Sequence, residues 1–223
     1  MATSGTKTFS LNIADTIEEA YELAGLEQRT GYDASAARRS LNIMFADWAN
    51  RGVNLWTIEE VTLSLSDGTA SYTLNSYDID VLSAVIRDTS KSPNLDTAID
   101  KIGRQEYLGI PTKTTKAKPS QYFVDRQTTP VVKLWPTPDS SNYQFISYRI
   151  QRIDDVSTSA ENPEVPSRFI PCMVSGLAYY IALKKNPEKA VILKQQYEQD
   201  FKLAADEDRN RAPLMLVPSG RFY

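Results

Sequence analysis

Closely spaced carboxylates are the groups in this sequence that come nearest to a catalytic arrangement. They occur at Glu18 and Glu22, at Glu59 and Glu60, at Asp154 and Asp155, and in the run from Asp206 to Asp208. Two carboxyl groups are sufficient to hydrolyse a glycosidic bond, one as the acid and the other as nucleophile or base. Charged residues on amphipathic helices are usually solvated, however. We therefore expect no catalytic site, and we keep a carboxylate-dependent peptidoglycan glycosidase as the alternative.

The composition removes most other catalytic chemistry. The 223 residues include no histidine and a single cysteine, Cys172. Without imidazole, the chain has no base of the usual kind for a serine or cysteine nucleophile, and it lacks the usual zinc ligand set. Cys172 lies in an apolar run and is interpreted as a buried hydrophobic residue. No CxxC, GxGxxG or other glycine-rich phosphate loop is present. The expectation is a protein with no enzymatic activity, no cofactor and no metal.

The basic residues give a weak indication of a nucleic-acid contact. The net charge of −3 does not by itself indicate a DNA or membrane partner. Lys113, Lys116 and Lys118 form a basic cluster in a loop and are a weak candidate for contact with DNA. No aromatic residues alternate with these lysines, so solubility of a long loop is the favoured interpretation. Arg38 and Arg39 are interpreted as a solvated helix face.

Targeting signals are not apparent. The first twelve residues lack the apolar stretch of a signal peptide. The longest apolar segment, residues 169–183, is shorter than the roughly 20 residues that span a bilayer. We expect a soluble protein of a reducing compartment that has no membrane partner.

Four amphipathic or apolar helices are predicted. The first begins after Asn12 and stops at Gly25, and the second ends at Gly52. Two more follow the spacer STSAENPEVPS: a nearly all-apolar segment, then a helix from Pro187 to Arg211. Three of the four helices have an apolar stripe at helical spacing. The stripe of the first helix is Ile13, Ile17, Ala20, Tyr21 and Ala24, and that of the second is Ala37, Leu41, Met44, Phe45 and Trp48. The stripe of the last helix is Ala190, Leu193, Tyr197, Phe201 and Ala204.

The middle of the chain has the period of β-strands. Alternating residues begin at Ile58, with a turn at Asp67-Gly68, and further strand candidates are residues 81–88, 121–126, 131–136 and 143–150. A short helical or irregular piece is expected near Gly103–Gly109. The predicted fold is α+β: a four-helix bundle, with two N-terminal and two C-terminal helices, that carries an inserted small antiparallel β domain. The predicted domains are residues 1–57 and 163–211 for the bundle, 58–162 for the β domain, and 212–223 for an extended C-terminal arm.

The C-terminal arm, RAPLMLVPSGRFY, is unusually apolar for a chain end. Pro213 and Pro218 favour an extended conformation. Full burial of four such side chains contributes about 6–10 kcal/mol before ordering costs. We therefore expect the arm to dock on a neighbouring protein surface rather than on its own domain. The predicted docking residues are Leu214, Met215, Leu216, Val217, Phe222 and Tyr223.

Dispersed residues along nearly the whole chain resemble a known family. In SLNIMFADWANRGVNLWTIEEVTLSLSDGTASYTL these are Leu41-Asn42, Trp48, Gly52 and Leu55-Trp56. The later β segment adds Trp135-Pro136 and Tyr148-Arg149, and VPSRFIPCMVSGLAYYIALKKNP is similar to the family's third helix. The sequence thereby resembles the head-to-tail adaptor (connector) proteins of short-tailed bacteriophages, of the packaged-DNA stabilisation and tail-tubular A type.

The resemblance implies a structural virion protein at the capsid vertex, between portal and tail, that is assembled in the host cytoplasm. It implies a ring of twelve copies under the portal that extends the DNA channel, helps to retain packaged DNA and provides a platform for tail or nozzle proteins. The implied partners are the portal ring, neighbouring copies, tail proteins and the double-stranded DNA in the channel. The resemblance also implies that the C-terminal arm reaches the portal or neighbouring subunits.

Overall fold

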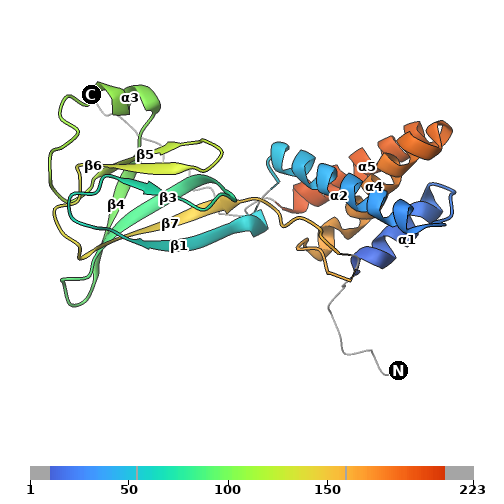
Figure 1. Ribbon diagram of the computed structural model, residues 1–223, viewed down its shortest axis with the longest axis horizontal. Coiled ribbons are helices and arrows are strands. Elements are labelled where there is room, and N and C mark those ends of the chain that lie inside the picture. The colour runs from blue at the N-terminus through green and yellow to red at the C-terminus, as the bar shows by residue number, and fades with distance from the viewer. Residues whose placement is uncertain (1–10, 54, 159, 209–223) are drawn as a thin grey trace, which may run out of the picture. The chain divides into compact units, whose positions relative to one another are not determined.

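The computed structural model describes residues 11–53, 55–158 and 160–208. The chain forms two compact units: the described residues of Met1–Met44 together with those of Val156–Tyr223, and Phe45–Asp155. The first unit is helical and the second is mostly β-structure (Figure 1). The two units are considered separately.

The helical unit is organised around one central apolar helix. Its elements are α1 (Ile13–Leu23), α2 (Gly31–Asn50, of which the residues after Met44 belong to the second unit), the 3-10 turn η2 (Ser167–Phe169), α4 (Ile170–Lys185) and α5 (Pro187–Glu207). Helix α4 is buried along most of its length and packs against both α1 and α5. Helix α2 is tied to α4 by a hydrogen bond from Lys184 Nζ to Ser40 Oγ, at 2.6 Å.

The local signals that begin and end the helices act largely as predicted. The Asn12 side chain accepts a hydrogen bond from the Asp15 N–H at 2.8 Å, which makes it the N-cap of α1. Gly25 ends the same helix with φ at +68°, a conformation that glycine adopts without strain. Pro187 is the first residue of α5, but the Asn186 side chain donates to Ala24 O at 3.0 Å and does not cap α5.

A close approach at Gly176 sets the packing of α4. A Cβ atom at this position would lie 2.5 Å from Met44 Sδ and 2.8 Å from the ring of Tyr197. Both distances are far below van der Waals contact. Gly176 therefore allows side chains of α2 and α5 to meet directly on the surface of α4.

The second unit contains a seven-stranded sheet with the order β1-β7-β3-β4-β5-β6-β2. Its elements are η1 (Leu55–Thr57), β1 (Ile58–Ser64), β2 (Ser71–Thr73), β3 (Asp78–Asp88), β4 (Leu95–Lys101), α3 (Arg104–Gly109), β5 (Gln121–Asp125), β6 (Val131–Trp135) and β7 (Tyr143–Gln151). The sheet is curled (Figure 1). Residues from most of its strands form one apolar core that includes Val81, Ile86, Tyr122, Leu134 and Phe145. Burial raises the pKa of the Tyr122 hydroxyl to about 12.

The predicted fold class is wrong in two respects. The sheet is mixed, because β4 and β5 pair in parallel while the other pairs are antiparallel. Parallel neighbours need a crossover connection, and α3 with the loop after it supplies one. The described residues also form five α-helices rather than four. In the helical unit α4 is central and the other helices pack around it, which differs from the predicted four-helix bundle with a small inserted β domain.

Strand β4 accounts for much of this error. Its sequence, LDTAIDK, is largely polar, and all of its residues except Ile99 are exposed. Its hydrophobic pattern was therefore too weak to predict a strand. The turn at Asp67-Gly68 does lie between β1 and β2, yet these strands do not pair with each other. Strand β1 pairs with β7, and β2 pairs with β6.

A buried ion pair joins β3 to β7. Arg149 Nη1 donates to Asp78 Oδ2 at 3.0 Å, and both side chains are almost completely buried. Arg149 Nε also donates to Ser147 Oγ at 3.0 Å, and Asp78 Oδ2 accepts the Asn75 N–H at 3.0 Å. Because both side chains are buried, each charge depends on the other for compensation.

Gly176→Leu should lower the free energy of unfolding. The added side chain has no space between Met44 and Tyr197, and overpacking of this kind costs about 1–3 kcal/mol or more. The measurement is a urea denaturation midpoint. Gly31→Leu is the matched control, because no atom lies within 4 Å of a Cβ placed there. Equal midpoints for the two variants would show that the close approach at Gly176 does not exist.

Arg149→Met should destabilise the β unit by about 3–5 kcal/mol, because it leaves the Asp78 carboxylate buried without its counter-charge. Adding Asp78→Asn should recover most of this loss, since no buried charge remains and the amide oxygen still accepts the Asn75 N–H. Arg87→Met is the control. Arg87 pairs with Asp96 at 2.7 Å in a partly exposed position, where solvent screens the ion pair and its loss should change the free energy of unfolding little. A double variant as unstable as Arg149→Met would contradict the argument.

Candidate functional site

The residues predicted to dock on a partner cannot be placed. The described residues end at Asp208, and all six predicted docking residues lie beyond it: Leu214, Met215, Leu216, Val217, Phe222 and Tyr223. Their role stays a prediction.

The three lysines predicted as a weak DNA contact lie in the segment between α3 and β5, and each has a partner within the chain. Lys113 Nζ donates to the carbonyls of Leu108 and Ile110, at 3.2 and 3.0 Å. Lys116 forms an ion pair with Asp67 at 2.9 Å. Lys118 Nζ donates to Thr97 Oγ1 at 2.7 Å. Only the Lys118 contact reaches a strand, β4, and the proposed DNA contact stays a prediction.

The predicted carboxylate pairs are either paired with other groups or exposed to solvent. Glu59 accepts a hydrogen bond from Gln151 Nε2 at 2.8 Å. Asp208 is held by Arg168. Glu18 and Glu22 lie on the exposed side of α1, and Asp154 and Asp155 are exposed.

The pKa shifts of the carboxyl groups are in the wrong direction for a general acid. Hydrogen bonds and neighbouring cations lower the pKa values of Asp33, Asp88 and Asp96. Hydrogen bonds from Ser157 and Thr158 lower the pKa of Glu161 to about 2. A glycosidase instead needs one carboxyl group whose pKa is raised, so that it is protonated near neutral pH. These four groups are therefore structural anions rather than general acids, and none of them belongs to the predicted carboxylate pairs.

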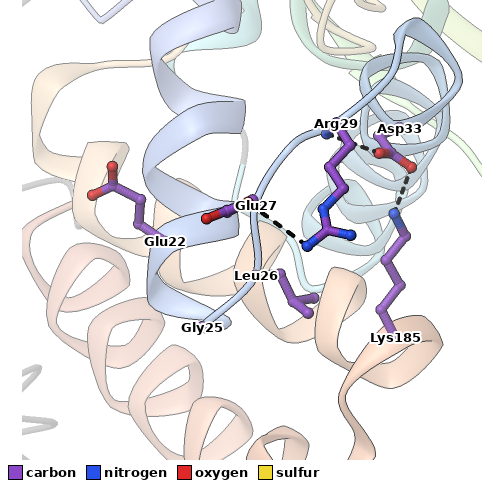
Figure 2. Close-up of a pocket in the computed structure, with 7 residues that line it drawn as sticks. All are labelled: Glu22, Gly25, Leu26, Glu27, Arg29, Asp33 and Lys185. Atoms are coloured by element: carbon purple, nitrogen blue, oxygen red, sulfur yellow. Dashed lines mark hydrogen bonds and ion pairs between the residues drawn. The ribbon is translucent and has the colours of Figure 1, made fainter.

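A surface pocket of about 750 Å³ lies between the α1–α2 loop and the end of α4. Figure 2 shows its lining residues, Glu22, Gly25, Leu26, Glu27, Arg29, Asp33 and Lys185. The Asp33 carboxylate faces Lys185 and the backbone of Arg29, whereas Glu22 points to the other side of the pocket. Arg29 contacts Glu27 at 3.7 Å, and both side chains are highly exposed.

Asp33 organises this pocket through several hydrogen bonds. Its Oδ2 accepts the backbone N–H groups of Arg29 and Thr30, at 3.1 and 3.2 Å, and its Oδ1 accepts from Lys185 Nζ at 2.5 Å. The hydrogen bond from Lys185 is the main cause of the lowered Asp33 pKa, and the same bond raises the pKa of Lys185. Lys185 Nζ also lies 5.2 Å from the centre of the Tyr21 ring. These contacts connect α1, the start of α2 and the end of α4, so the polar groups of the pocket stabilise the helical unit.

The sequence reading missed a second set of apolar residues on two helices. Helix α2 exposes two large apolar side chains, Tyr32 and Ile43. Helix α5 exposes three, Val191, Ile192 and Leu203. They lie off the apolar stripes used to predict the helices, so the search for one buried face per helix passed over them. Their spacing was available in the sequence as a second, weaker stripe. They are the structure's clearest candidates for contacts with a partner.

The described residues were compared with two further requirements, those of a metal site and of a membrane span. They contain no group of three or more His, Cys, Asp and Glu side chains positioned to hold a metal ion. Among the same residues, no helix has the length and apolar character that a membrane span requires.

Comparison with known proteins identifies the family. No curated protein matches the sequence. The model of the SU10 adaptor protein family, however, matches residues 12–217, which include the described parts of both units. This is a family of phage head-to-tail adaptors, which are structural proteins, and it implies a place in the virion between portal and tail with contacts to both. The chain therefore belongs to the SU10 adaptor protein family, and the predicted resemblance to a phage head-to-tail adaptor is confirmed.

Proposed function

We propose that the chain forms a ring under the portal that extends the DNA channel, helps to retain packaged DNA and provides the attachment platform for tail proteins. The observation that carries the proposal is the family match over residues 12–217. Most oligomers of one chain have closed symmetry, and a ring is the closed form that can surround a central channel. The proposed ring has twelve copies, as the adaptor resemblance implies.

The arm at residues 212–223 is proposed as the segment that docks on the portal or on a neighbouring copy. Fifteen residues follow Asp208. At about 3.3 Å per residue they can extend about 50 Å, enough to reach another subunit. The proposed domain division stays as predicted: residues 1–57 and 163–211 as the helical body, 58–162 as the β domain and 212–223 as the arm.

Contact with the packaged DNA is proposed to be weak. Tight binding to many phosphates would hold the DNA in place, whereas a channel has to let it move. The net charge of −3 supports this view. So do the partners of Lys113, Lys116 and Lys118, because each ammonium group is already in contact with oxygen atoms of the chain.

Truncation after Arg211 should abolish binding to portal rings and leave the fold intact. The removed residues carry the apolar side chains that the proposal places on the partner. The measurement is co-sedimentation with portal rings of the same phage, with the urea midpoint as the check on folding. Full-length Ser219→Ala is the control, since it changes a polar residue of the same arm. Co-sedimentation of the truncated chain at the level of the full chain would exclude docking through the arm.

The triple variant Lys113→Gln, Lys116→Gln and Lys118→Gln should change DNA affinity little. In a titration with double-stranded DNA at several salt concentrations, the full chain should bind weakly with a shallow salt dependence. Each phosphate contact contributes about 0.9 to the slope of log affinity against log salt. A steep slope that falls by about this amount for each lysine removed would show that the lysines hold DNA.

A further inference from the structure

Helix α2 has an exposed face that nothing in the described part of the helical unit covers. Tyr32, Ala36, Arg39 and Ile43 follow one another at the spacing of a single helix face. Tyr32 is 72% exposed and Ile43 57% exposed. The opposite side of the helix is buried through Ala37, Leu41 and Met44. We call these four residues, of which Ala36 is half-buried and the other three are exposed, the α2 face.

The α2 face has uncompensated positive charge beside it. Arg39 Nη1 donates to Ser35 Oγ at 3.1 Å, and its guanidinium lies 5.9 Å from the centre of the Tyr32 ring. Lys184, at the end of α4, donates to Ser40 Oγ. Within the described ranges, neither cation has a carboxylate partner. Burial, and then the nearby Arg39 charge, lower the pKa of Lys184. Two adjacent cations without a counter-ion favour a partner surface that carries carboxylates.

Helix α5 has a second exposed face, which carries two carboxylates and has exposed Lys202 at its edge. Its members also follow one side of the helix: Glu188, Ile192, Gln195, Gln199, Leu203 and Asp206. Ile192 is 67% exposed and Leu203 64% exposed. Glu188 and Asp206 place a carboxylate near each end, and the two glutamines lie between the aliphatic side chains. The opposite side of α5 is buried through Ala190, Leu193, Tyr197 and Ala204. We call the six exposed residues the α5 face.

We propose that the α2 face of one copy packs against the α5 face of the next copy. The inference rests on the proposed ring and identifies the surfaces that form it. Ile43 and Tyr32 would contact Ile192 and Leu203, while Arg39 and Lys184 would approach the carboxylates of α5. Pairing of α2 with α2 would bring like cations together, and pairing of α5 with α5 would bring like carboxylates together. Pairing of α2 with α5 avoids both kinds of like-charge repulsion and is therefore the more favourable arrangement.

The two faces lie on different helices of the same unit, which is compatible with a ring. Each face lies opposite the residues that its own helix buries in the shared core, so both faces point away from that core on different helices. A contact between two different surfaces is heterologous, and it closes into a ring when the rotation between copies permits. One such interface, repeated, uses both exposed faces on every copy and leaves neither uncovered.

Cysteine cross-linking tests the proposal directly. The full chain with Ile43→Cys and Ile192→Cys is assembled on portal rings of the same phage and treated with a short bis-maleimide. Both positions are highly exposed, and the native Cys172 is fully buried, so the introduced thiols are the accessible ones. The expected result is a ladder of multimers on a denaturing gel. Either single variant should give monomers only, because position 43 then has no thiol at position 192 to react with. Glu19→Cys with Ile192→Cys is the matched control. Glu19 is also exposed, but it lies on α1 and belongs to neither face of the proposed interface, so this pair should give monomers.

The outcomes separate this inference from the proposed function. Rings that form and give the ladder support the inference. Rings that form, seen by electron microscopy, without the ladder overturn the inference and leave the proposed function in place. Dimers from a single variant overturn it as well, because they show like faces in contact. Absence of rings in the presence of portal overturns both proposals.

Discussion

The burial of α4 is the constraint on which the helical unit depends. This helix is apolar on nearly every side, so it is stable in water only when other helices cover it. Helices α1 and α5 pack on it directly, and α2 is held to it by Lys184 and Lys185, which bond to Ser40 and Asp33. Gly176 leaves room for the side chains of Met44 on α2 and Tyr197 on α5, which a Cβ there would clash with. Each covering helix turns its own apolar stripe inward, and this fixes which residues it presents outward.

Two carboxylates outside the predicted pairs, Asp33 and Glu161, have structural roles in the helical unit. Asp33 binds two backbone N–H groups and Lys185, which closes the loop between α1 and α2. Glu161 organises the segment that returns from the β unit, through the N–H groups of Ser157 and Thr158, and its carbonyl accepts the Ile13 N–H at 3.0 Å. Their lowered pKa values follow from these bonds. Such groups favour one arrangement of the chain, which suits a structural component of a virion.

Much of the local structure was predictable from sequence, because short-range physics determines it. Asn12 and Gly25 mark the ends of α1 through a cap and a left-handed glycine, and the apolar stripes give the buried sides of the helices. Longer-range pairing was not predictable. Strand β4 is polar, and its position in the sheet depends on pairing with the strands on both sides. Its parallel pairing with β5 depends on a crossover segment whose sequence shows no regular hydrophobic spacing. The exposed faces of α2 and α5 were overlooked because a stripe search ends once one buried face is found.

The proposed ring is a defined oligomeric state, and mass is the property that reports it most directly. Native mass spectrometry of the full chain, alone and mixed with portal rings of the same phage, measures how many copies each particle holds. The account predicts particles whose mass is that of the portal ring plus a fixed, ring-closing number of adaptor chains, twelve on the proposed stoichiometry. Portal rings that keep their own mass in excess adaptor, or that take up a variable number of copies, would contradict it.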